Sequence, residues 1–180
     1  HTDTGVTTDL QEVVFVGNPE GGAVGGHGTV LKSGDAGTSW TKQNGAISEN
    51  TTWTESESPF QITGNVSVSS GVTLTIEPGV TVKFDSGKAL IVDGTLVSQG
   101  TSTDGITFTS SATSPAAGDW KYINFTSSST PATFDGNGDY TAGSILEYTT
   151  VEYAGLGTSN ATAIKMESAS PFINQSTIQN

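Results

Sequence analysis

Residues 71–84 read GVTLTIEPGVTVKF, and this stretch decides the fold class. Apolar side chains take every second position of 74–76 and of 80–84, and threonine or lysine stands between them. A period of two predicts short strands with one face turned to a core. The separating Glu77-Pro78-Gly79 is typical of a tight turn. The stretch therefore predicts two very short strands joined by a turn.

The same pattern recurs along most of the chain. Further short runs of β-branched and aromatic residues, separated by Gly, Asn, Asp or Ser, occupy 66–68, 89–92, 95–97, 106–108, 122–125, 145–146, 150–153, 163–166, 171–173 and 177–178. Strands this short suit a solenoid better than an antiparallel sandwich. The steps in sequence from Ile76 to Val97 and from Phe84 to Phe108 are each close to one coil of a three-faced β-helix. These spacings predict an all-β chain wound into the coils of a parallel β-helix.

The residue pattern of the sequence changes near residue 48. Residues 1–48 carry Gly-Gly pairs and a Lys-Ser-Gly-Asp turn, whereas residues 49–180 carry the coil pattern. We therefore expect an N-terminal hairpin segment over 1–48 and a β-helix over 49–180. Two turn-rich stretches, 110–119 and 127–143, are expected to project as loops from coil corners.

The composition excludes several classes of function. Cysteine is absent, which excludes disulfides, thiolate metal sites and thiol nucleophiles. All six basic residues are lysines, and 18 acids bring the net charge to -12, so the surface repels phosphate backbones and anionic lipid. No apolar run reaches the roughly 18 residues of a bilayer crossing. We expect no nucleic-acid binding, no membrane insertion, and a signal peptide, if one existed, already removed.

Residues 25–40 read GGHGTVLKSGDAGTSW and resemble an Asp-box, or BNR, repeat. Ser33, Asp35, Gly37 and Trp40 match the motif, and Ser39 replaces its threonine. The resemblance implies a β-hairpin whose aspartate accepts backbone N–H groups and whose tryptophan anchors the turn to a core. The motif occurs once, so it implies neither a propeller nor an activity. We expect this segment to cap the β-helix.

Residues 50–110 and 170–178 resemble the coils of right-handed parallel β-helix domains of secreted and cell-surface bacterial proteins. The resemblance rests on stretches such as GVTLTIEPGV at 71–80, VDGTL at 92–96 and ITFTS at 106–110. It implies a right-handed β-helix that is secreted or displayed on a cell surface. It leaves function open, because such domains serve as adhesins, stalks, filaments and enzyme scaffolds. The family usually has more coils, so we expect an open C-terminal coil end, continued by a longer chain or covered by a neighbouring subunit.

Glycan-cleaving enzymes are often built on β-helices, but these residues do not favour one. Lyases of the arginine-base type need an arginine, which the chain lacks. Galacturonases combine clustered aspartates with a Gly-His-Gly; Gly26-His27-Gly28 reproduces the tripeptide upstream of every coil and without neighbouring aspartates. We therefore expect no enzyme and no catalytic residue.

One acidic turn is a candidate metal site. Asp135, Asn137 and Asp139 place oxygens at alternate positions, as in the first half of a calcium loop. An EF-hand loop would need an acid at residue 146, which is leucine. Calcium binding and a solvated acidic turn therefore both stay open, and no other cofactor is expected.

Further candidate surface residues come from sequons and tyrosines. Five Asn-X-Ser/Thr sequons are candidate glycosylation sites and favour a surface location: Asn50, Asn65, Asn124, Asn160 and Asn174. Tyr140, in the second turn-rich stretch, and Tyr148 are the candidate glycan contacts.

These observations favour an extracellular, non-enzymatic structural or adhesive β-solenoid. We expect its open coil ends to bind identical subunits or another surface protein, and end-to-end assembly would give a filament or surface layer. The alternative is a glycan-binding module of a larger secreted adhesin or polysaccharide-degrading enzyme. Apolar, uncapped coil ends would favour assembly, and exposed aromatics beside acids on one coil face would favour the glycan module.

Overall fold

The structure is a computed structural model that describes residues 10–15, 21–25, 30–32, 40–157 and 161–179. The chain forms two compact units, residues 1–39 and residues 40–180. The second unit thus begins earlier in the chain than the expected boundary near residue 48. The reason is that the polar segment Thr41–Ile47 already pairs with the β-helix, although its sequence lacks the apolar alternation of the later strands.

The first unit contains a small antiparallel sheet. Its strands are β1 (Leu10–Phe15), β2 (Gly21–Gly25) and β3 (Val30–Lys32), in that order. Ser33, Asp35 and Gly37 of the Asp-box resemblance lie outside the described residues, as does the tripeptide 26–28, so that turn and its capping role stay predictions. Trp40 belongs to the second unit, where the Lys83 Nζ lies 4.5 Å from the centre of its ring.

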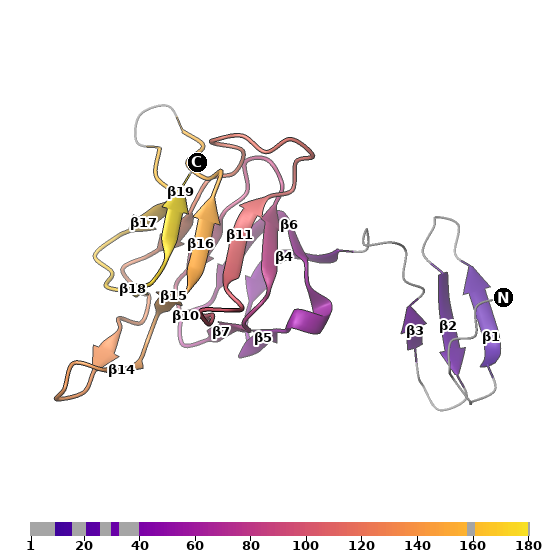
Figure 1. The fold of residues 1–180 in the computed structure, drawn as a ribbon, viewed down its shortest axis with the longest axis horizontal. Helices are drawn as coiled ribbons and strands as arrows, with labels where there is room; N and C mark the ends of the chain where they lie inside the picture. The colour runs from indigo at the N-terminus through magenta and orange to yellow at the C-terminus, as the bar shows by residue number, and fades with distance from the viewer. Residues whose placement is uncertain (1–9, 16–20, 26–29, 33–39, 158–160, 180) are drawn as a thin grey trace. The chain divides into compact units, whose positions relative to one another are not determined.

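The second unit is a right-handed parallel β-helix with three faces (Figure 1). The first sheet consists of β5 (Thr51–Trp53), β7 (Thr73–Ile76), β10 (Thr95–Gln99), β15 (Ile145–Glu147) and β18 (Phe172–Asn174). A single 3₁₀ turn, η1 (Glu55–Glu57), follows β5. In the described part of the chain, no helix is long and apolar enough to span a membrane.

The other two faces share β4 (Thr41–Ile47) and β6 (Phe60–Val68). The first half of β6 pairs with β8, and its second half pairs with β9, so β6 turns a corner of the helix. The second sheet continues with β8 (Thr81–Phe84), β11 (Ile106–Ser110), β16 (Thr149–Glu152) and β19 (Thr177–Gln179). The third sheet continues with β9 (Leu90–Val92), β12 (Ile123–Phe125) and β17 (Ile164–Met166).

One expected loop carries strands of its own. Within the turn-rich stretch 127–143, β13 (Thr133–Phe134) and β14 (Tyr140–Ala142) pair antiparallel. This hairpin projects from the coils between the third face of one coil and the first face of the next (Figure 1).

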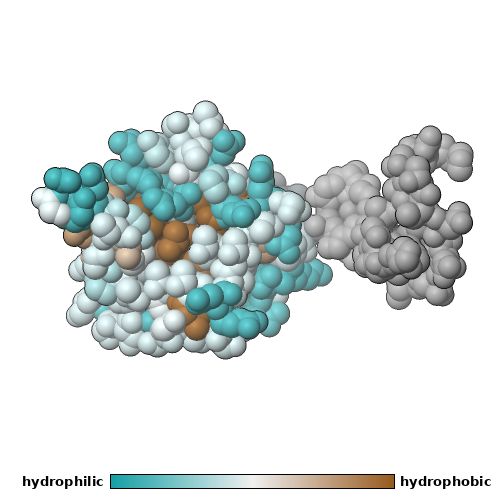
Figure 2. Space-filling view, turned by 90° about the horizontal axis from the view of Figure 1, so that it is seen from below, coloured by the Kyte–Doolittle hydropathy of each residue, from teal (hydrophilic) through white to brown (hydrophobic). Residues whose placement is uncertain are grey.

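Ladders of inward side chains form the core. Phe60, Val82, Phe108 and Val151 stand in parallel register on the second sheet, and each is at most 1% exposed. The Phe84 ring also stacks on the buried ring of Trp120, with centroids 4.0 Å apart. Because each coil covers the previous one, a chain with 33% hydrophobic residues still builds a continuous core. In Figure 2 most of the surface in view is of intermediate or hydrophilic character, and hydrophobic residues form small patches.

Candidate functional site

Two rows of outward side chains cross the first sheet. In the apolar row, Val97, Ile145 and Phe172 are register partners on successive strands. Two positions further along the same strands, Gln99, Glu147 and Asn174 form a polar row. Parallel pairing stacks equivalent positions directly, which places side chains from distant parts of the chain next to one another.

The carboxylate of Glu147 connects the three side chains of the polar row through hydrogen bonds. Its Oε2 accepts a hydrogen bond from Gln99 Nε2 at 2.9 Å, and its Oε1 accepts one from Asn174 Nδ2 at 2.7 Å. The two amides therefore fix the carboxylate from both sides. Their own carbonyl oxygens, together with the remaining lone pairs of Glu147, provide a line of hydrogen-bond acceptors.

Three aromatic rings meet beside the polar row, and we call Phe134, Tyr140 and Phe172 the aromatic platform. Tyr140 is stacked with Phe172 at 6.1 Å between ring centroids, and Phe134 meets Phe172 edge-on at 5.1 Å. The base of the hairpin is held by a hydrogen bond from the Tyr140 hydroxyl to the Gly143 carbonyl oxygen. Phe134 is 47% exposed, whereas the outward-facing Ile145 is completely buried. The hairpin rings thus pack against Phe172 of the sheet, and Phe134 is the most exposed of the three rings.

The platform and the polar row are electrostatically linked. Burial raises the pKa of the Tyr140 hydroxyl, and the negative charge of Glu147 raises it further. Tyr140 therefore stays a neutral donor and acceptor over the physiological pH range. The other predicted glycan contact, Tyr148, follows Glu147 at a coil corner in a left-handed conformation, with φ 45°. Its backbone is used in coil stacking, because its carbonyl oxygen accepts from the Ile106 N–H.

The predicted calcium residues lie in the hairpin turn. Asp135 Oδ1 accepts the backbone N–H groups of Asn137 at 2.8 Å and Asp139 at 2.9 Å, so this oxygen closes the turn. The N–H of Asp139, followed by that of Asn137, holds the pKa of the Asp135 carboxyl below its usual range. No three acidic or histidine side chains gather for a metal within the described ranges. Calcium binding at this turn stays a prediction.

The sequons differ in accessibility. Asn50 and Asn65 are exposed, although their Oδ1 atoms accept the N–H groups of Thr73 and Ala89 in the next coil. Asn124 is 8% exposed, which does not suit it as a glycan acceptor, and Asn174 belongs to the polar row. Asn160 lies outside the described residues.

Acids at the coil corners act as hydrogen-bond acceptors between coils. Asp85 Oδ1 accepts from Gln61 Nε2 and from the Ser111 hydroxyl, both at 2.7 Å. Glu152 accepts from the Thr109 hydroxyl at 2.8 Å and from Gln179 Nε2 at 3.1 Å. These carboxylates connect successive coils, which is a structural use of their charge.

The last described coil exposes residues of the core ladders. Ile178 is the register partner of Val151, and Met166 is the register partner of Phe125. The two partners are buried, but Ile178 is 52% and Met166 is 50% exposed. An apolar edge is therefore present on strands β17 and β19.

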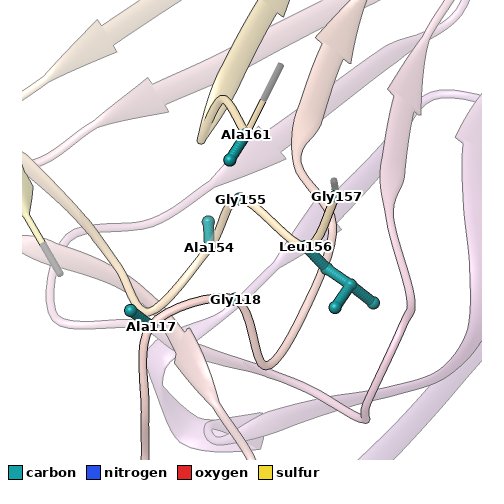
Figure 3. A pocket seen from close by; sticks show the side chains of 7 residues that line it. All are labelled: Ala117, Gly118, Ala154, Gly155, Leu156, Gly157 and Ala161. Atoms are coloured by element: carbon teal, nitrogen blue, oxygen red, sulfur yellow. The ribbon is translucent and has the colours of Figure 1, made fainter. Parts of the chain in front are cut away.

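A surface cavity of about 320 Å³ lies near the corner after β16 (Figure 3). The described residues that line it offer backbone and small or apolar side chains: Ala117, Gly118, Ala154, Gly155, Leu156, Gly157 and Ala161. Such a lining lacks a titratable group, and we assign it no chemistry.

The sequence alone identified Tyr140 as a glycan contact and Asn174 as a sequon, but it indicated neither the other residues of the platform nor Gln99 and Glu147 of the polar row. Phe134 and Phe172 belong to different coils and stand far apart in the sequence, as do Gln99 and Glu147. The only sequence signal was the apolar Phe134 inside a polar, turn-rich stretch.

Comparison with known proteins identifies the fold. A family model described as a pectate-lyase-like β-helix domain matches residues 45–166. No curated protein and no solved structure matched the chain.

Proposed function

Because the chain belongs to the family of pectate-lyase-like β-helix domains, we propose that it is a non-catalytic, extracellular scaffold that pairs with a second copy through the apolar edge of strands β17 and β19. The observation that carries this proposal is the half-exposed pair Met166 and Ile178, which continue two otherwise buried ladders. A further coil stacked on β17 and β19 would remove both side chains from water, which is favourable.

Two other observations support a scaffold. The acids Asp85 and Glu152 are engaged in hydrogen bonds that hold coils together. The exposed sequons at Asn50 and Asn65 support a place outside the cell.

The β4 edge and the β17–β19 edge of the described coils differ in polarity, and this difference favours a closed pair over a filament. At the β4 end, the polar Thr41 and Gln43 stand in register with the core ladders of the second sheet, and Ile47 is already partly buried. At the β17–β19 edge, the exposed ladder residues are Ile178 and Met166. Joining unlike ends would bring apolar residues largely against polar ones, whereas two β17–β19 edges match each other. A contact of like with like closes after two subunits.

The test is the solution mass of the purified chain by light scattering over a range of concentrations, with negative-stain microscopy. We expect a monomer–dimer equilibrium, and expect Met166→Lys and Ile178→Lys each to leave only monomer. The matched control is Leu156→Lys, because Leu156 is 45% exposed but lies outside these ladders. A wild-type monomer at every concentration, or dimers that persist in both lysine variants, would overturn the proposal. Long rods would replace the closed pair with a filament.

A further inference from the structure

The outer face of the first sheet carries a second feature, which does not depend on how the coil ends pair. The aromatic platform (Phe134, Tyr140 and Phe172) lies beside the polar row (Gln99, Glu147 and Asn174). We propose that these two features together form a binding site for a neutral oligosaccharide.

The aromatic side of the site suits the apolar face of a sugar ring. An exposed ring supplies large apolar area with little loss of conformational freedom, and it stacks on the C–H face of a pyranose. Phe134 is the ring to which this applies, because it is 47% exposed while its edge contact with Phe172 fixes its position. Tyr140 supports it from the other strand of the hairpin, with ring centroids 6.5 Å apart.

The polar side of the site suits sugar hydroxyls. The amides of Gln99 and Asn174 hold Glu147 in place before any ligand arrives. A fixed carboxylate accepts hydrogen bonds from neighbouring hydroxyl groups, and little ordering is needed on binding. Neighbouring side chains of the polar row stand on adjacent strands, which are about 4.8 Å apart. This spacing is comparable to the length of one sugar unit in an oligosaccharide.

The negative charge of the site determines whether it favours neutral or acidic glycans. Glu147 lies at the centre of the site, the chain lacks arginine, and its net charge is -12. A polyuronate such as polygalacturonate would bring its carboxylates against this field. The site therefore favours uncharged sugars, even though the family is described as pectate-lyase-like.

The test is isothermal titration calorimetry with cellohexaose, xylohexaose, mannohexaose, maltohexaose and a polygalacturonate oligomer. We expect at least one neutral hexaose to bind and the polygalacturonate oligomer not to bind at low salt. Phe134→Ala should weaken that binding about tenfold. Glu147→Gln, which keeps the size and one acceptor of the side chain, should weaken it several-fold.

Leu156→Ala is the matched control, because it removes a similarly exposed apolar side chain away from the site. Its affinity should equal that of the wild type. Thermal unfolding of each variant separates loss of binding from loss of fold. The proposal is overturned if none of the neutral hexaoses binds, if polygalacturonate binds as tightly, or if folded Phe134→Ala and Glu147→Gln both bind like the wild type.

Discussion

Ile178 lies beside Val151 in the parallel register of β19 and β16, yet Val151 is 1% exposed and Ile178 is 52% exposed. Two aliphatic residues thus occupy the same ladder with different burial. The difference arises because the coil containing β19 covers Val151, whereas Ile178 stands on the last described strand of this sheet.

The first prediction compares these two positions. Val151→Ala should lower the free energy of unfolding by about 2 kcal/mol, because it leaves a cavity in a filled ladder. Ile178→Ala should lower it by less than about 1 kcal/mol, because the side chain is already half in water. Urea unfolding at concentrations where the chain is monomeric measures both. Equal losses would show that Ile178 contributes to the core as fully as Val151.

The second prediction concerns a hydroxyl pair inside the core. Ser98 and Thr149 are buried, and their hydroxyl oxygens lie 2.9 Å apart. Thr149→Val should cost about 1–3 kcal/mol, because the Ser98 hydroxyl loses this buried partner. The double variant Ser98→Ala/Thr149→Val should cost less than the sum of the two single variants, because it removes both polar groups. Strict additivity in a double-mutant cycle would contradict a coupled pair.

The fold class could be predicted because its signal is local. Alternation in 71–84 determines which side chains face inward, and Leu74, Ile76, Val82 and Phe84 are all buried as the pattern requires. The register could not be predicted in the same way. Leu74 pairs with Leu96, so Ile76 stands beside Ser98 and not beside Val97. A spacing wrong by one residue reverses the facing of a strand.

The site was harder to predict because coil lengths differ. Between β7 and β10 the register advances from Leu74 to Leu96, but between β10 and β15 it makes a much longer step, from Val97 to Ile145. The longer step contains the β13–β14 hairpin. A prediction that assumes the same number of residues in every coil therefore assigns the wrong register after this insertion. The pairing of Gln99 with Glu147 becomes visible only in the three-dimensional structure.

The third prediction is a pH dependence centred on Asp119. The hydroxyl of Ser110, followed by the N–H of Ala116, holds the pKa of the Asp119 carboxyl below its usual range. A lowered pKa stabilises the fold above the unfolded value, about 3.9, and this stabilisation is lost as the pH falls through the folded value. Ser110→Ala should therefore destabilise the chain at pH 7 and lose much of that effect near pH 2.5.

The measurement for this third prediction is urea unfolding of wild type and Ser110→Ala across the pH range. The difference between the two chains isolates the Ser110–Asp119 contact from the titration of the other acids. An equal difference at pH 7 and at pH 2.5 would mean that the buried hydroxyl acts through packing alone.

The fourth prediction tests how closely the coils approach at a corner. A Cβ at Gly94 would lie 2.2 Å from the Val72 carbonyl oxygen and 2.3 Å from that of Ser69, and backbone atoms cannot move aside as a flexible side chain can. Gly94→Ala should cost more than about 3 kcal/mol or prevent folding, because the two coils would have to separate. The control is Gly136→Ala in the hairpin turn, where a Cβ meets nothing within 4 Å. Its stability should stay within about 0.5 kcal/mol of the wild type. Thermal unfolding of both variants is sufficient, since equal stability of the two would contradict the close approach of the coils at Gly94.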